Sequence, residues 1–238
     1  QGVHTITPEG RHLLDRSRCI ACGKCAYDCP HTALNLIGRR YEPEELVKQL
    51  LKDRKFYETS GGGVTFSGGE PMLHPAYLAQ VLHLCKEAGL HTAVDTAGCV
   101  PFESFETVLP WADLFLYDIK LWDEERHKAA TGVSNRRILE NLRRLTDAGA
   151  SVFIRTPVIP TYSADLEELG HIAAFLAGLP HREGVRLIQL LPYHNYGVGK
   201  YRSLGSASQT EELRPPEDSF MQEALQRYLD LGLPAQIS

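Results

Sequence analysis

Short apolar runs alternate along most of the chain with longer stretches in which apolar residues recur every three or four positions. The short runs are rich in Val, Ile, Leu and Phe and are bounded by polar, Gly or Pro residues, which is typical of buried β-strands. Five strands are predicted in this way, and a sixth is expected at Pro234–Ser238. The five begin at Val64–Phe66, His91–Asp95, Leu114–Asp118, Val152–Arg155 and Val185–Leu190.

The stretches between these strands have recognisable helix ends. Pro43 and Pro75 suit the first turn of a helix, and Gly89 and Gly149 suit the position just after one. Helices are predicted at residues 43–57, 75–89, 134–149, 163–179 and 216–231. Alternating strands and helices indicate right-handed βα units on a parallel sheet. Because a complete eight-unit barrel takes about 250 residues, residues 41–238 are expected to form an α/β fold, an incomplete, open (β/α) barrel of about six units.

Composition and charge narrow the possible functions. Of the 238 residues, 43% are hydrophobic and 23% charged, which excludes an intrinsically disordered chain. The formal net charge of −5 argues against a nucleic-acid partner bound by phosphate neutralisation. No apolar run approaches the roughly 20 residues that span a bilayer. We therefore expect a cytoplasmic protein, with no membrane partner, that acts as a monomer.

Four of the six cysteines lie close together in the pattern C-x2-C-x2-C-x3-C-P, at Cys19, Cys22, Cys25 and Cys29, followed by Pro30. This is the spacing of iron–sulfur ligands in bacterial ferredoxins. A disulfide cluster is disfavoured because the chain has no secretory features, and zinc sites combine one C-x2-C with a second, distant pair. Residues 1–40 are therefore expected to be a ferredoxin-like segment that binds a [4Fe–4S] cluster.

In two-cluster ferredoxins the fourth cysteine of such a run ligates the other cluster, so a further thiolate is needed. Cys85 lies on an apolar helical stripe and is expected to be a packed structural residue, and Cys99 is expected in a loop. The chain opens on Gln1 and has methionine only at Met72 and Met221. The missing ligand is thus expected from a segment upstream of Gln1.

Polar residues stand at the carboxyl ends of the predicted strands, where α/β folds carry their chemistry. The first strand ends in Ser67-Gly68-Gly69-Glu70, whose glycines expose backbone beside a carboxylate and suit a ligand with an ammonium group. The other strand ends carry Asp95, Asp118, Lys120, Arg155 and His194. Together these residues suggest a site for a zwitterionic, polar ligand.

Each of these residues also has a simpler interpretation. Ser67–Glu70 could be a strand-to-helix turn with a capping carboxylate, Asp118 and Lys120 a surface ion pair, and His194 an ordinary loop histidine. The triplet Gly61–Gly63 lacks the G-K-[ST] ending of a phosphate-binding loop and is interpreted as a hinge. The functional interpretation is favoured because successive strand ends all carry polar groups.

Four stretches resemble the activating enzymes of glycyl radical enzymes, within the radical S-adenosylmethionine superfamily. They are Gly62–Pro71, Asp95-Thr96-x-Gly98, Asp118-x-Lys120 and Leu191–Tyr201. The resemblance, which covers nearly the whole chain, implies that Ser67–Glu70 binds the amino end of S-adenosylmethionine. It also implies that Asp95, Thr96 and Asp118 hold a monovalent cation beside the ligand's carboxylate. Lys120, Arg155 and His194 match positions that contact the cofactor or the target peptide, and are the candidate catalytic residues.

In the family that the chain resembles, a reduced [4Fe–4S] cluster cleaves S-adenosylmethionine, and the resulting 5′-deoxyadenosyl radical takes hydrogen from a glycine Cα of a partner enzyme. The resemblance implies a glycyl radical enzyme as protein substrate and an electron donor such as flavodoxin or ferredoxin. The cysteine run at Cys19–Cys29 resembles the auxiliary-cluster insert of the longer members. This disfavours pyruvate formate-lyase as the partner, because its short activators lack that insert.

One departure is that the superfamily's C-x3-C-x2-C motif is absent from these 238 residues. The motif is expected upstream, and the chain by itself is expected to be inactive. Two other functions remain open: a radical S-adenosylmethionine enzyme acting on a small molecule, and a non-catalytic electron-transfer or binding module. Neither the identity of the partner nor the number of auxiliary clusters follows from the sequence.

Overall fold

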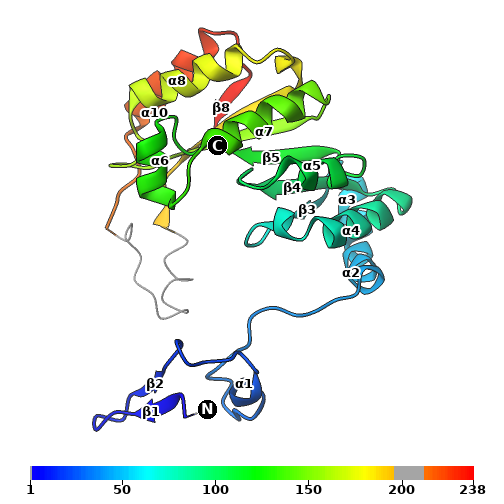
Figure 1. Cartoon of the computed structure of the whole chain (residues 1–238), viewed down its shortest axis with the longest axis vertical. Coiled ribbons are helices and arrows are strands. Elements are labelled where there is room, and N and C mark those ends of the chain that lie inside the picture. The colour runs from blue at the N-terminus through cyan, green and yellow to red at the C-terminus, as the bar shows by residue number, and fades with distance from the viewer. Residues whose placement is uncertain (1, 196–211) are drawn as a thin grey trace. The chain divides into compact units, whose positions relative to one another are not determined.

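The computed structural model describes residues 2–195 and 212–238. The chain divides into two compact units, Gln1–Glu42 and Pro43–Ser238 (Figure 1). This division falls two residues after the domain boundary expected at residue 40. None of the helices in the described ranges is long and apolar enough to cross a membrane.

The first unit contains little regular structure. Strands β1 (His4–Ile6) and β2 (His12–Leu14) form an antiparallel hairpin, and α1 (Lys24–Tyr27) is a single turn within the cysteine run. Among the unit's described residues, only Val3 belongs to the buried hydrophobic set. A segment of this size with so small a core ordinarily requires a disulfide, a metal or a partner for stability. None of the six cysteines forms a disulfide.

The second unit is built on a six-stranded parallel sheet whose spatial order follows the sequence, from β3 to β8. Among the described residues, no seventh or eighth strand closes this sheet into a barrel. The predicted fold class, an α/β fold with an incomplete, open (β/α) barrel, is confirmed. The sixth strand is present as expected. The strands are β3 (Gly63–Phe66), β4 (His91–Thr96), β5 (Leu114–Asp118), β6 (Val152–Val158), β7 (Val185–Pro192) and β8 (Ala235–Ile237).

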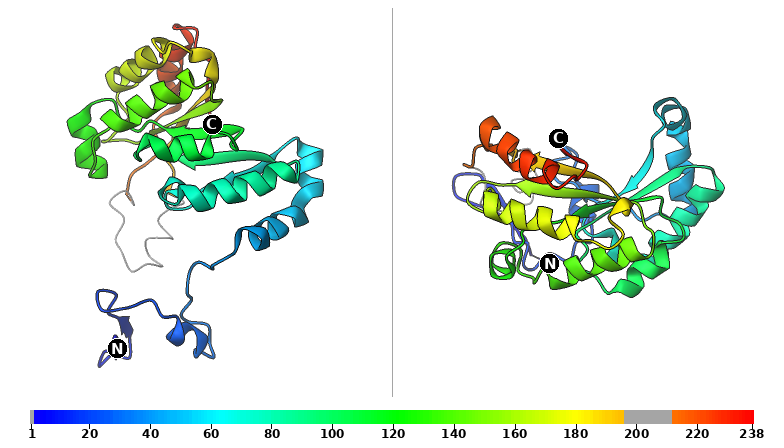
Figure 2. Two further views of the ribbon diagram at one scale, coloured as in Figure 1. Left: turned by 45° about the vertical axis from the view of Figure 1, so that its right-hand side comes forward. Right: turned by 90° about the horizontal axis from the view of Figure 1, so that it is seen from above.

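Helices connect the strands and lie along the sheet (Figures 1 and 2). The helix expected at 43–57 is two helices joined by a 3-10 turn at Leu51–Asp53, and two short helices, α5 and α6, were not predicted. Two further 3-10 turns lie at Pro71–Leu73 (η2) and Arg182–Gly184. The α-helices are α2 (Pro43–Leu50), α3 (Arg54–Ser60), α4 (Pro75–Glu87), α5 (Phe102–Val108), α6 (Glu124–Thr131), α7 (Arg136–Asp147), α8 (Leu166–Ala177) and α10 (Asp218–Leu229).

Strand alternation divides the sheet into an apolar face and a functional face. Tyr117 and Ile154, paired in register on β5 and β6, belong to the core formed with the helices. The next pair along the same strands, Asp118 and Arg155, points to the opposite face. The sheet thus buries one set of side chains under the helices and presents the alternate set to the candidate site.

Cys85 packs in a smaller core cluster between α2, α4 and β3 and has no exposed surface. Burial raises the pKa of its thiol to about 11. The side chain is therefore held as a neutral thiol, which agrees with the structural role expected for it.

Candidate functional site

A pocket of about 310 Å³ is lined by residues at or just after the carboxyl ends of β3, β4 and β5 and by one residue from the middle of β6. This volume lies near the lower end of the usual range for small-molecule sites. Ala97 is its only lining residue that the sequence analysis did not single out. The lining residues are Ser67, Gly68, Gly69, Glu70, Asp95, Ala97, Asp118, Lys120 and Arg155.

The turn after β3 brings bare backbone to the pocket. Gly68 has a φ of +135°, which L side chains rarely adopt. A Cβ built on Gly68 or Gly69 meets no atom within 4 Å, so a side chain there would project into open space. Both glycines line the pocket, so their backbone forms part of its wall. The absence of side chains allows a ligand to approach the backbone closely.

The Glu70 carboxylate ties the ends of β3 and β4 together. One oxygen, Oε1, accepts hydrogen bonds from the Met72 amide at 3.1 Å and the Thr96 hydroxyl at 2.9 Å. The other, Oε2, accepts from the Ala97 amide at 2.8 Å. Glu70 is thus the cap of the 3-10 turn η2, as the simpler interpretation proposed, and it also fixes the loop after β4. Its place in the pocket lining leaves it able to face a ligand as well.

Thr96 does not line the pocket, in contrast to its neighbour Asp95. Adjacent strand residues point to opposite faces, so Thr96 lies buried, with 1% of its surface exposed. Its hydroxyl donates to Glu70 and accepts from the Gly98 amide at 3.0 Å. The monovalent cation stays a prediction, and the structure gives Thr96 a different set of partners.

Arg155 bridges the two aspartates of the pocket. Its Nη2 atom lies 2.5 Å from Asp95 Oδ1 and 2.9 Å from Asp118 Oδ1, and its Nε lies 3.1 Å from the same Asp118 oxygen. Lys120 Nζ donates to the other Asp118 oxygen at 2.6 Å. A cation bound by Asp95 and Asp118 would have to compete with Arg155. The pocket therefore presents two cationic groups and three carboxylates, counting Glu70, to a ligand.

The surroundings of Asp95 displace its ionisation from that of a free aspartate. Burial raises its pKa, and the neighbouring carboxylates of Asp118 and Glu70 act in the same direction. The Arg155 guanidinium opposes this rise by attracting the charged form. The charge state of Asp95 thus depends on whether Arg155 stays beside it.

His194 lies just after β7, is exposed, and is not part of the described pocket lining. Its role as a candidate catalytic or cofactor-binding residue stays a prediction. Of the matching stretch Leu191–Tyr201, the part after Asn195 lies outside the described residues.

The loop after β4 is held by residues that no sequence pattern indicated. The Asn141 side chain on α7 donates to the carbonyls of Gly98 and Val100, both at 2.8 Å. A Cβ on Gly98 would lie 2.0 Å from the Tyr117 hydroxyl, so only glycine fits there. Asn141 and Tyr117 thus fix the segment that presents Ala97, although neither lines the pocket. Their roles follow from contacts between distant parts of the sequence.

The four cysteines of the first unit have the donor chemistry of an iron–sulfur site but are not gathered into one. Cys19 and Cys22 are exposed and Cys25 and Cys29 half-buried. No three Cys, His, Asp or Glu side chains in the described ranges are close enough to share a metal. Backbone amides, first that of Ala33, lower the pKa of Cys29 and favour its thiolate. Amide donors to sulfur also tune iron–sulfur clusters, so the residues fit the predicted ligand.

Replacing the four cysteines of the first unit by serine is expected to remove about four iron atoms per chain, or about eight if two clusters are lost together. Iron and acid-labile sulfide would be measured after anaerobic reconstitution of the full-length protein. Cys99→Ser, a half-buried cysteine of the second unit, is the control and should keep its iron. Equal iron in the four-serine variant and the wild type would exclude these residues as ligands.

Glu70→Ala is expected to weaken S-adenosylmethionine binding about thirtyfold or more, because truncating a partially buried charged partner costs about 2–5 kcal/mol. It should also lower the free energy of unfolding by about 2 kcal/mol, because three donors lose their acceptor. Calorimetry and urea unfolding measure the two effects. Glu103→Ala, at an exposed position on α5, should change neither. Unchanged affinity in Glu70→Ala would remove Glu70 from the ligand site.

The chain is similar to known proteins over most of its length. The model of the Radical SAM superfamily matches residues 20–175. The trans-4-hydroxy-L-proline dehydratase activating enzyme of Clostridioides difficile is 41% identical over 243 aligned positions, which cover 89% of this chain and 79% of the relative. The isethionate sulfite-lyase activating enzyme of Nitratidesulfovibrio vulgaris is 42% identical over 194 positions, 80% of this chain and 62% of the relative.

A solved structure shares both the fold and a substantial part of the sequence. A domain of the pyruvate-formate lyase-activating enzyme from Bacteroides vulgatus has a TM-score of 0.64 and 36% sequence identity to the chain. The match covers 75% of this chain and 99% of that domain. The parallel sheet and the strand ends that form the pocket thus lie in a fold already observed by experiment.

Proposed function

Because the chain belongs to the radical S-adenosylmethionine superfamily and, within it, to the activating enzymes of glycyl radical enzymes, we propose that its pocket binds S-adenosylmethionine for hydrogen abstraction from a glycine Cα of a partner protein. Enzymes of this superfamily use a [4Fe–4S] cluster and S-adenosylmethionine. The chain spans 79% and 62% of the first two relatives described above. The proposed hydrogen abstraction is therefore an activity of the full-length protein and not of these 238 residues alone.

The observation that carries this proposal is the charge pattern of the pocket. S-adenosylmethionine combines an ammonium group, a carboxylate and a sulfonium, and the pocket sets Glu70, Asp95 and Asp118 beside Lys120 and Arg155. Glu70 and the bare backbone of Gly68 and Gly69 suit the ammonium group. Arg155 and Lys120, which already bind carboxylates of the chain, have the donors to bind the ligand's carboxylate.

When bound by the full-length protein, the superfamily's [4Fe–4S] cluster would supply the electron for cleavage of S-adenosylmethionine, and the residues of this chain would bind and orient the ligand. Arg155 must exchange part of its contact with Asp95 or Asp118 for the ligand's carboxylate. With three carboxylates and two cationic groups, the pocket carries a formal excess of negative charge, which suits a ligand with two cationic groups and one carboxylate.

The partner is proposed to be a glycyl radical enzyme, and its identity is left to experiment. The relatives described above are named for three different partners: trans-4-hydroxy-L-proline dehydratase, isethionate sulfite-lyase and pyruvate formate-lyase. The net charge of −5 gives no support to a nucleic-acid substrate. A cytoplasmic location, a monomeric state and electron donation by flavodoxin or ferredoxin belong to the same proposal.

The decisive experiment incubates the reconstituted full-length protein with S-adenosylmethionine, a reductant and each of these three enzymes in turn. A glycine-centred radical seen by electron paramagnetic resonance, with one 5′-deoxyadenosine formed per radical, is the expected result for at least one. Modification of a small metabolite without any protein radical would instead favour a small-molecule enzyme. Failure to bind S-adenosylmethionine at all would favour a non-catalytic electron-transfer module.

A further inference from the structure

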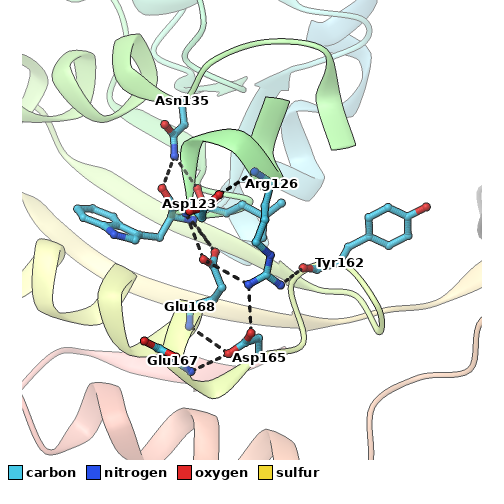
Figure 3. A network of polar contacts seen from close by, with 9 residues as sticks. Asp123, Arg126, Asn135, Tyr162, Asp165, Glu167 and Glu168 are labelled. Atoms are coloured by element: carbon cyan, nitrogen blue, oxygen red, sulfur yellow. Dashed lines mark hydrogen bonds and ion pairs between the residues drawn. The ribbon is translucent and has the colours of Figure 1, made fainter. Parts of the chain in front are cut away.

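A buried carboxylate outside the pocket is bound to the loop that carries Lys120. Glu168 on α8 has only 5% of its surface exposed. Its carboxylate accepts hydrogen bonds from the Trp122 amide at 2.9 Å and from the Asp123 amide at 3.2 Å (Figure 3). These amides lie two and three residues after Lys120, on the segment that leads from β5 to α6. A side chain on one βα unit therefore holds the strand-end loop of the preceding one.

A local role for Glu168 at the start of α8 is not observed. Asp165 caps α8, and an acidic residue three positions after the cap ordinarily reaches back to the cap's own amide. Here the Asp165 amide donates to the Ser163 carbonyl at 2.9 Å, so it does not use Glu168. The Asp165 carboxylate meanwhile accepts from the Glu167 and Glu168 amides. Glu168 is thereby free to act across the fold.

The same loop is held from its other side by Asn135. Its side-chain amide donates to the Leu121 carbonyl at 3.0 Å and to the Trp122 carbonyl at 2.6 Å. Both the amide and the carbonyl of Trp122 are therefore bound by buried side chains. The two contacts fix the backbone within two residues of Lys120, while the lysine side chain itself lines the pocket.

Arg126 completes the network and compensates the charge of Glu168. Its Nη1 atom lies 3.5 Å from Glu168 Oε1 and 3.1 Å from Asp165 Oδ2, and its Nη2 donates to the Tyr162 carbonyl at 2.7 Å (Figure 3). A buried carboxylate is costly unless it is paired and hydrogen-bonded. A neutral cap or an exposed glutamate would stabilise α8 without that cost, so the buried charge requires a reason beyond the helix itself.

We propose that Glu168 is a positioning residue, which holds the loop after β5 so that Lys120 remains in the pocket beside Asp118. Lys120 lies 2.6 Å from Asp118 and keeps 36% of its side chain exposed, so its side chain is not held in place by burial. The inference rests on the proposed function, because it takes the pocket as the S-adenosylmethionine site. It extends that function to a residue that contacts neither the ligand nor the reacting atoms.

A double-mutant cycle tests whether Glu168 acts through Lys120. S-adenosylmethionine dissociation constants would be measured by calorimetry for the reconstituted full-length wild type, Glu168→Ala, Lys120→Met and the double variant. We expect Glu168→Ala to weaken binding about tenfold and to have no further effect once Lys120 is absent. Losses that multiply in the double variant would overturn the proposal, because Glu168 would then act by a general structural effect.

Matched variants keep the test informative if Glu168→Ala folds poorly. Glu168→Gln retains the shape and one acceptor oxygen and should show a smaller loss of affinity in the same direction. Glu167→Ala removes an exposed carboxylate from the same helical turn and should bind as the wild type does. A loss in Glu167→Ala as large as that in Glu168→Gln would contradict a specific role for Glu168.

A second measurement does not depend on the ligand. The rate at which an amine-acylating reagent modifies Lys120, located by mass spectrometry, should rise several-fold in Glu168→Gln, because the lysine would leave Asp118 more often. The rate should be unchanged in Glu167→Ala. If the wild type does not bind S-adenosylmethionine, the proposed function fails, whereas a Lys120 rate that does not respond to Glu168 overturns the positioning role.

Discussion

Replacing Arg155 by methionine is expected to weaken S-adenosylmethionine binding about a hundredfold or more. The variant loses the group that bridges Asp95 and Asp118 and that is proposed to receive the ligand's carboxylate. Truncating one partner of a hydrogen-bonded charge pair costs about 2–5 kcal/mol. Calorimetry on the reconstituted full-length protein measures the loss. Arg186→Met, an exposed arginine on β7 outside the pocket lining, is the matched control.

The same substitution is expected to make stability depend on pH. Burial already raises the pKa of Asp95 above its ordinary value of 3.8, and Arg155 is the cation that limits the rise. Without Arg155 the folded-state pKa should rise further, so ionising Asp95 costs more in the folded than in the unfolded protein. The free energy of unfolding of Arg155→Met, relative to the wild type, should therefore fall as the pH increases above about 4.

Urea unfolding between pH 4 and pH 7.5 measures this dependence. At neutral pH the variant should be about 2 kcal/mol less stable than the wild type. This is less than the cost of breaking a fully buried ion pair, because about a fifth of each side chain is exposed to solvent. At pH 4 the difference should shrink, since Asp95 is then largely protonated in the variant. A stability difference that is constant with pH would mean that Arg155 does not control the ionisation of Asp95.

Gly69→Ala should abolish most ligand binding while leaving the fold intact. The added methyl group meets no atom within 4 Å in the chain, and it stands on the turn that lines the pocket and is proposed to hold the ligand's ammonium group. We expect at least a tenfold loss of S-adenosylmethionine affinity. The free energy of unfolding should be unchanged or higher by about 0.5 kcal/mol, because alanine restricts the unfolded chain.

Gly98→Ala is the contrasting variant. Its φ of +73° and a Cβ position 2.0 Å from the Tyr117 hydroxyl predict a fold that is less stable by about 2 kcal/mol or more. Urea unfolding measures the loss of stability and calorimetry the loss of affinity. We expect Gly69→Ala to lower mainly the affinity, and Gly98→Ala to lower the stability. Wild-type affinity in Gly69→Ala would show that no ligand occupies the space beside this turn.

The sequence was sufficient for the sheet because each strand is short, apolar and bounded by polar or breaking residues. Leu114–Asp118 has the predicted bounds, and the sixth strand forms where it was expected. The helices α5 and α6 were missed for a physical reason. Each spans only about two turns. Half of the residues of α6 are charged and only His127 is buried, so α6 lacks the apolar stripe that makes a helix recognisable.

The candidate site was predictable in part because parallel strands bring their carboxyl ends to one edge of the sheet. Strand alternation, also a property of the sequence, could have separated Asp95 from Thr96, which face opposite sides. The sequence could not show whether a polar side chain caps a turn or binds a ligand. Glu70 suits both a cap and a ligand-binding group, and its three hydrogen bonds only become visible once β3 and β4 lie side by side.

The sequence by itself determined the six strands, most of the helices, the parallel sheet and the identity of most residues that line the pocket, because these depend on local periodicity and on the direction of the chain. Only the tertiary structure decided which groups satisfy one another. Asp95 and Arg155 lie 60 residues apart and Trp122 and Glu168 lie 46 apart. Hydrogen bonds and ion pairs act over a few ångströms in space, so their partners are fixed by how the strands and helices pack.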